Sequence, residues 1–320
     1  MKLLSRLLSG IALTGVLLTG PAIYFHRQNI SDWWRLRGYT PSAEIVKLAD
    51  ESSMTPFARR LFYVQHPQLD DAQSFNQNCS GVEQTIVLGC YVSKKGIYIF
   101  RVVDKRLAGI HQVTAAHEML HAAYDRHNKQ EKDRIDKLTA SVFKNSTDKR
   151  IIDVIASYKS KDTSVVPNEL HSILATEMRV LPAELETYYS KYFIDRDIIV
   201  DYSEDYENAF SERQTLIASL LNQINSLEVS LQKQKISIDQ ILAELKVDSA
   251  RLQQLKSSGR NNDYNAAVPP YNTNIQHYRQ LVDAYNSGVR QLNNLVKQHN
   301  KIAIEQRQLV DAINSHSGGL

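Results

Sequence analysis

The stretch that organises the chain is Thr114-Ala115-Ala116-His117-Glu118-Met119-Leu120-His121-Ala122-Ala123. Its alanines favour helix, and a helix places residues i and i+4 on one face. His117 and His121 therefore present two imidazoles to one point, as tetrahedral zinc requires of its first two protein ligands. Glu118 lies beside them, where its carboxylate would take a proton from an attacking water. The pattern predicts a zinc site; the alternative is an amphipathic helix with two half-buried histidines.

This stretch resembles the active-site helix of the zincin metallopeptidases. The metzincin branch is disfavoured, because residues 124–128 contain no glycine and place the next histidine too close. The gluzincin branch takes a Glu from a downstream helix, and residues 168–177 are similar to that helix. There Asn168-Glu169 opens the helix and a small residue, Ser172, stands three places after Glu169. The resemblance implies that His117, His121 and Glu169 hold one zinc ion, with Glu177 as the alternative third ligand.

A zinc peptidase also needs a group that stabilises the oxyanion beside the metal. The gluzincin relatives use Tyr or His for this purpose. By that resemblance the candidates are His171, Tyr158 and Tyr188, and the sequence does not rank them.

Two β-rich runs, residues 85–92 and 96–103, flank the turn at residues 93–96 and predict a β-hairpin. In zincins, the strand beside the active-site helix is often an edge that pairs with an extended peptide. The resemblance therefore makes the second run the candidate substrate strand, with an open edge of unpaired N–H and C=O groups. Its central residues are Ile97, Tyr98, Ile99 and Phe100. The alternative is a strand covered within a small sheet.

The two cysteines, Cys79 and Cys90, could close a short loop through one disulfide in an oxidising compartment. Their spacing does not fit a C-x-x-C redox or zinc pair. The alternative is two unconnected buried thiols.

The N-terminus carries a targeting signal. Lys2 and Arg6 precede residues 7–25, which contain no charge and are long enough to span a bilayer. We expect a signal anchor over residues 1–27 with the bulk of the chain extracytoplasmic; a cleaved signal peptide is the alternative. The net charge of +3 and the absence of a Lys/Arg-rich run give no indication of nucleic-acid binding.

The C-terminal third has a heptad pattern from Ile217 to Leu255, which predicts a coiled-coil arm. Pro269 and Pro270 argue against helix in the following segment. A second arm with a weaker pattern, rich in Asn and Gln, then runs to Ile313. We expect an antiparallel hairpin over residues 201–320 with its tip at about 259–271, available for a protein partner or for self-association.

The sequence therefore predicts an α+β chain with three parts. A membrane helix (1–27) precedes a mostly helical zincin-like domain with a small β-hairpin (28–200), and the coiled-coil hairpin follows. The expected function is that of a membrane-anchored, extracytoplasmic zinc metallopeptidase acting on a peptide or protein. The alternative is a catalytically silent scaffold that acts through its coiled coil in an envelope assembly.

Overall fold

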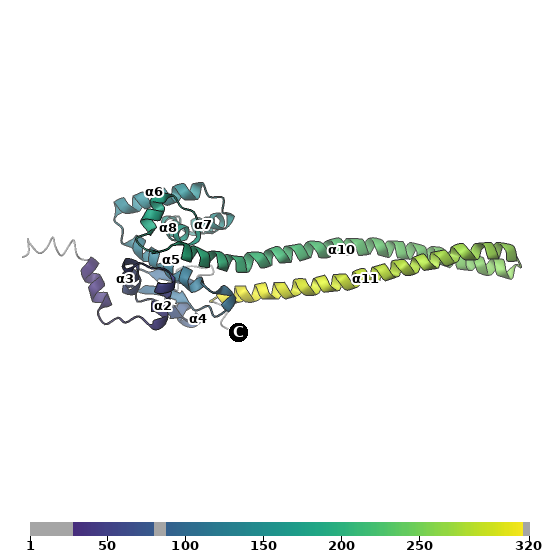
Figure 1. Cartoon of the computed structure of the whole chain (residues 1–320), viewed down its shortest axis with the longest axis horizontal. Coiled ribbons are helices and arrows are strands. Elements are labelled where there is room, and N and C mark those ends of the chain that lie inside the picture. The colour runs from purple at the N-terminus through teal and green to yellow at the C-terminus, as the bar shows by residue number, and fades with distance from the viewer. Residues whose placement is uncertain (1–27, 80–87, 316–320) are drawn as a thin grey trace, which may run out of the picture. The chain divides into compact units, whose positions relative to one another are not determined.

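A computed structural model describes residues 28–79 and 88–315. The predicted membrane segment over residues 1–27 lies outside the described residues. The described chain is mostly helical, with one small sheet and two long C-terminal helices (Figure 1). Its internal contacts define two compact units, one formed by residues up to Asn208 together with those from Asp311 onward, the other by Ala209–Val310. No helix of the described residues has the length and apolarity to cross a membrane.

The first unit begins with short helices whose caps can be read from the sequence. The side chains of Ser42 and Thr55 accept hydrogen bonds from the first turns of α2 (Ala43–Glu51) and α3 (Pro56–Val64). Asp71 caps α4 (Ala72–Asn78) in the same way. The core of this unit includes Leu48, Leu61 and Phe62 from α2 and α3, all of them buried.

Within the described residues, three strands form one sheet in the order β1-β3-β2. They are β1 (Gln68–Asp70), β2 (Gly89–Val92) and β3 (Gly96–Phe100). The antiparallel pairing of β2 with β3 confirms the predicted hairpin, and Lys94 in its turn has a φ of 65°.

The prediction that Ile97, Tyr98, Ile99 and Phe100 form an open edge is wrong. These residues belong to β3, which is the central strand of the sheet. β1 pairs with it in parallel, placing Leu69 opposite Ile99, and β2 covers its other side. Every residue of β3 is buried, so the described strands leave only β1 and β2 at the ends of the sheet.

A single 3₁₀ turn, η1 (Lys105–Leu107), leads into the H-E-x-x-H helix, α5 (Ile110–Asp125). Gly109 precedes α5 with a φ of 94°, a conformation that favours glycine. A Cβ at this position would also lie 2.5 Å from the ring of Tyr202. α5 is buried on nearly all sides, which explains why its sequence carries so few charges.

Four short helices lie between α5 and the two long helices of the described chain. The chain breaks between α6 (Lys129–Lys144) and α7 (Lys149–Lys161), and the side chain of Asp148 caps α7. α8 (Val166–Glu177) has Pro167 in its first turn, where proline is tolerated. α9 (Ala183–Tyr189) carries tyrosines that enter the core.

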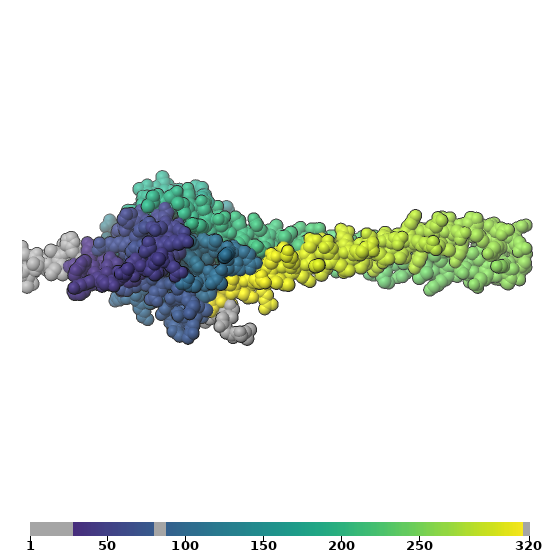
Figure 2. Space-filling view, turned by 60° about the horizontal axis from the view of Figure 1, so that its bottom comes forward, coloured from purple at the N-terminus to yellow at the C-terminus, as the bar shows by residue number. Residues whose placement is uncertain are grey.

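The two long helices are α10 (Asp197–Ser257) and α11 (Asn261–Ile313), and α10 begins in the first unit. Within the second unit they lie side by side and antiparallel (Figures 1 and 2). Arg213 pairs with Glu305, while a Cβ on Gly288 would lie 2.7 Å from the side chain of Leu231.

The predicted position of the tip, residues 259–271, is wrong. α11 begins at Asn261 and contains Pro269 and Pro270, so only residues 258–260 connect the two helices. Each proline removes one backbone hydrogen bond. The carbonyls that lose these bonds belong to residues 265 and 266, which are exposed, as are both prolines. Water can therefore satisfy these carbonyls, and the helix continues.

Candidate metal centre

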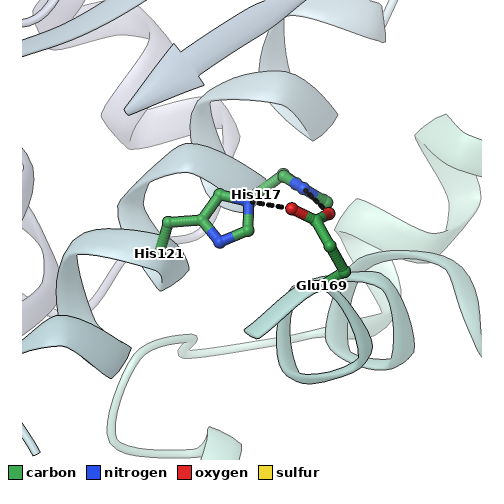
Figure 3. A group of neighbouring side chains, drawn as sticks. All are labelled: His117, His121 and Glu169. Carbon is green, nitrogen blue, oxygen red and sulfur yellow. Dashed lines mark ion pairs between the residues drawn. The ribbon is translucent and has the colours of Figure 1, made fainter. Parts of the chain in front are cut away.

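α5 and α8 together bring three ligand-type side chains to one place. Nε2 of His117 lies 3.6 Å from Oε2 of Glu169, and Nε2 of His121 lies 3.6 Å from Oε1 of the same carboxylate. The two imidazole planes are nearly perpendicular, at 81°. Figure 3 shows the two histidines on α5 and Glu169 on α8 turned toward one another. One ligand atom from each residue lies within 4.8 Å of the others, a group that could hold a metal ion.

Burial and charge give the two histidines different proton affinities. Burial lowers the pKa of His117, but the carboxylates of Glu169 and Glu118 outweigh it and raise this pKa to about 9. At His121 burial prevails, helped by the charge of His117, and lowers the pKa to about 4. Burial raises the pKa of Glu169, whereas His117, His121 and a hydrogen bond from Tyr158 together hold it below its ordinary value. The group thus combines an anionic carboxylate with a position that favours positive charge.

The donor set suits a metal ion. Oε2 of Glu169 is buried, and Nε2 of His117, with which it pairs, stands 3.6 Å away, too far for a hydrogen bond. A bound cation would give this oxygen the close partner that it lacks. Two imidazole nitrogens and one carboxylate oxygen form a ligand set of catalytic zinc sites, which keep the fourth position open. His117, His121 and Glu169 are the residues that would hold the ion.

A cavity of about 590 Å³ opens on this group. His117, His121, Glu118 and Glu169 all line it, and so does Tyr158 of α7. A molecule that enters this cavity could therefore contact the three ligands and Glu118 together.

β2 lies directly against α5 at one wall of the cavity. A Cβ on Gly89 would lie 2.8 Å from Oε1 of Glu118 and would also overlap the side chain of Thr114. The next residue, Cys90, forms the predicted disulfide with Cys79 at the end of α4, and this disulfide is confirmed. Glycine at position 89 therefore allows the close approach of β2 and Glu118, and the disulfide ties β2 to α4.

Ser172 contacts His121, one of the three candidate metal ligands. Its side chain is fully buried, and its Oγ lies 3.3 Å from Nδ1 of His121. A hydrogen bond from Nδ1–H to Ser172 would leave Nε2 of His121, the nitrogen nearest Glu169, free to bind a metal.

The remaining predicted site residues do not belong to the three-residue group. Glu177 lines the cavity but forms an ion pair with Arg150, outside the three-residue group. Tyr158 also lines the cavity, so it remains a candidate oxyanion stabiliser.

His171 and Tyr188 belong to the core and are not among the residues that line the cavity. His171 follows Glu169 by two positions, about 200° around α8, so the helix turns it away from the ligands. Its Nε2 lies 2.8 Å from the hydroxyl of Tyr188. This arrangement removes both residues from the oxyanion candidates.

Sequence reasoning missed several residues of the cavity. Arg150 contacts Glu177 and Glu207, so the start of α10 contributes to the cavity wall together with α7 and α8. Neither Arg150 nor Glu207 has a sequence signal that distinguishes it from surface charge. Gly89 did have one, because a glycine inside a β-rich run indicates a bulge or a close backbone approach.

Comparisons of the chain with protein-family models, with curated proteins and with solved structures found no match. The functional assignment therefore depends on the site itself.

Proposed function

We propose that the chain is a zinc-dependent metallopeptidase. The observation that carries this proposal is the convergence of His117, His121 and Glu169 on one point in a cavity that Glu118 also lines. A structural zinc site is usually closed by four protein ligands, whereas a catalytic one has three. Three ligands at a cavity that Glu118 also lines favour catalysis.

In this proposal each residue has a distinct task. His117, His121 and Glu169 would hold the zinc, whose chemistry when bound is that of a Lewis acid that polarises carbonyls and lowers the pKa of water. Glu118 would accept a proton from the attacking water as its oxygen adds to the peptide carbonyl carbon. As the C–N bond breaks, Glu118 would deliver that proton to the leaving amine. Tyr158, whose hydroxyl donates to Glu169 in this structure, would instead donate a hydrogen bond to the oxygen of the former carbonyl.

The substrate would be an extended peptide or protein segment lying beside β2. This strand replaces β3 as the candidate substrate strand, because it stands at one end of the described sheet and its residues Gly89, Cys90 and Tyr91 line the cavity. An end strand offers backbone N–H and C=O groups to an extended chain.

The location proposed for the enzyme follows from the sequence and the disulfide. Residues 7–25 would anchor the chain in a membrane, with the bulk of it extracytoplasmic. The Cys79–Cys90 disulfide supports an oxidising compartment.

The alternative is a scaffold that acts through the α10–α11 hairpin, as a coiled coil that binds a partner. One observation favours it: α10 exposes Val229, Ile236 and Val247 at spacings that keep them on one helix face. The two functions differ at Glu118, because metal binding alone does not require this carboxylate whereas peptide hydrolysis does.

The test is cleavage of a mixed peptide library by the full-length chain in detergent, with new amino termini detected by mass spectrometry. We expect zinc-dependent cleavage by the wild type and a loss of about a hundredfold or more in Glu118→Gln, which removes the base. Zinc content should be unchanged in this variant. Glu184→Gln, on the exposed side of α9, is the matched control and should keep full activity.

Two results would contradict the enzyme assignment. One is equal cleavage by the wild type and by Glu118→Gln. The other is a zinc-loaded wild type that cleaves no peptide of the library, which would leave the scaffold function.

A further inference from the structure

An exposed pair of tryptophans stands at the start of the described chain. The helix over residues 28–36, drawn in purple in Figure 1, carries Trp33 and Trp34, which are 56% and 61% exposed. Their ring centroids are 5.3 Å apart, and the guanidinium of Arg37 lies 5.5 Å from each ring. Large aromatic side chains are seldom left this exposed unless they meet a partner.

This pair is held firmly on the first unit. Asp32, only 4% exposed, forms a bidentate ion pair of 2.8 and 2.9 Å with Arg126 at the C-terminal end of α5. The guanidinium of Arg35 donates hydrogen bonds to the carbonyls of Val64, Lys94 and Lys95. The tryptophans therefore occupy a preformed surface joined to the active-site helix.

Positive charge accompanies the aromatic pair. The bonds from Arg35 bring the β2–β3 turn against the helix, and the side chains of Lys94 and Lys95 in that turn are exposed. Arg37 adds a third cation beside the rings. The nearest acidic residue on this helix, Asp32, is already paired with Arg126. Tryptophan with surrounding Lys and Arg is the composition that the headgroup region of an anionic bilayer attracts.

We propose that Trp33, Trp34, Arg37, Lys94 and Lys95 form a docking surface for the headgroup region of a phospholipid bilayer. The position of the surface supports this occupant, because the uncharged run of residues 7–25 ends only three residues before the first described residue of this helix. The surface would do more than attach the chain to the membrane. Through the Asp32–Arg126 pair it fixes the direction of α5, and with it the cavity, relative to the bilayer plane.

The two tryptophans are the only ones in the chain, so intrinsic tryptophan emission reports on this surface alone. The full-length chain would be placed in vesicles of phosphatidylcholine, with or without phosphatidylglycerol. Some vesicles would contain lipids brominated near the headgroup end of the acyl chain, others lipids brominated near its methyl end. We expect bromine near the headgroups to quench at least about twofold more strongly than bromine near the bilayer centre, because tryptophan prefers the interface. Iodide in the water should quench less than it does for the chain in detergent-free solution.

A second experiment tests the contribution of Lys94 and Lys95 to lipid binding. Lys94→Gln/Lys95→Gln should abolish the additional quenching that phosphatidylglycerol produces, while Lys159→Gln/Lys161→Gln, which removes two exposed lysines at the end of α7, should leave it unchanged. The proposal is overturned if the tryptophans stay as accessible to iodide as in solution, or if neither bromolipid quenches them. Failure of the chain to bind the vesicles would overturn it as well. None of these readings depends on peptidase activity.

Discussion

At the scale of single residues, Gly89 is where the sheet meets the proposed base. Gly89→Ala would place a methyl group 2.8 Å from Oε1 of Glu118 and against the side chain of Thr114. Overpacking of this kind costs about 1–3 kcal/mol of unfolding free energy. A displaced base should also lower kcat/KM by about tenfold or more, with zinc content unchanged. Urea unfolding, zinc analysis and the peptide assay measure the three effects.

The double variant Gly89→Ala/Thr114→Ser separates the two contacts. Serine keeps the hydroxyl that donates to the carbonyl of Ile110 and removes the methyl group that the new Cβ would meet. Stability should largely return while activity stays low, because Glu118 is still displaced. Full recovery of activity in the double variant would show that Gly89 does not position the base.

His111 provides a pH dependence away from the metal ligands. Burial, then the charge of Arg101, lower its pKa below the usual 6.5, and its Nε2 accepts a hydrogen bond of 2.8 Å from the N–H of Val102. A histidine with a lowered folded-state pKa binds its proton more readily when unfolded. Its contribution to stability is therefore complete above pH 6.5 and is lost as the pH falls through the folded-state pKa.

We expect His111→Gln to reduce the loss of stability between pH 7.5 and pH 5, because glutamine can accept the same hydrogen bond without titrating. Urea midpoints at several pH values give the comparison, with His299→Gln on α11 as the control that should follow the wild type. An unchanged pH dependence in His111→Gln would contradict the assigned protonation state.

The site residues differ in how far the sequence predicts them. His117 and His121 lie one turn apart on one helix, so local geometry is sufficient to pair them. Glu169 is 48 positions after His121, and only the resemblance to a gluzincin helix indicated it. The contact between Ser172 and His121 depends on how α5 and α8 pack, which no spacing in the sequence records.

At the scale of elements, the prolines of α11 give a clear test. Pro269 and Pro270 lie inside the helix and are exposed, so replacing them with alanine removes no packing. Each replacement should stabilise α11 by about 1–3 kcal/mol, since proline in a helix interior loses a hydrogen bond and crowds the preceding turn. Slower amide hydrogen exchange over residues 261–275 is the measurement.

Pro56→Ala is the matched control. Pro56 stands at the first position of α3, where proline suits the helix and alanine gives no such gain. If Pro269→Ala and Pro270→Ala make amide hydrogen exchange faster instead, the helix over residues 261–270 is contradicted. These residues would then belong to the turn that the sequence pattern predicts.

The elements that the sequence missed are those without a local pattern. The β2–β3 hairpin followed from two β-rich runs around a turn, but β1 has only three residues and pairs with a strand 30 positions later. Because β1 was missed, β3 was taken for an edge. The prediction from Pro269 and Pro270 was wrong for a different reason. Proline inside a helix is tolerated better where the carbonyls that lose their hydrogen bonds face water.

At the scale of the whole molecule, zinc should stabilise the first unit and leave the second unchanged. A ligand that binds only the folded state at a concentration of a hundred times its Kd adds about 2.7 kcal/mol. The three ligands all belong to the first unit, as do both tryptophans. Near-ultraviolet circular dichroism should therefore show a melting temperature that rises with zinc and falls with chelator. Hydrogen exchange over the central residues of α10 and α11 should not respond.

The measurement closest to the central claim is the zinc content of the purified full-length chain, compared with Glu169→Ala and Glu177→Ala. We predict about one zinc per chain in the wild type and in Glu177→Ala, and its loss in Glu169→Ala, because a site with only two protein ligands holds zinc weakly. A folded wild type that takes up no zinc when the metal is added, or loss of zinc in Glu177→Ala alone, would contradict the metal centre described for His117, His121 and Glu169.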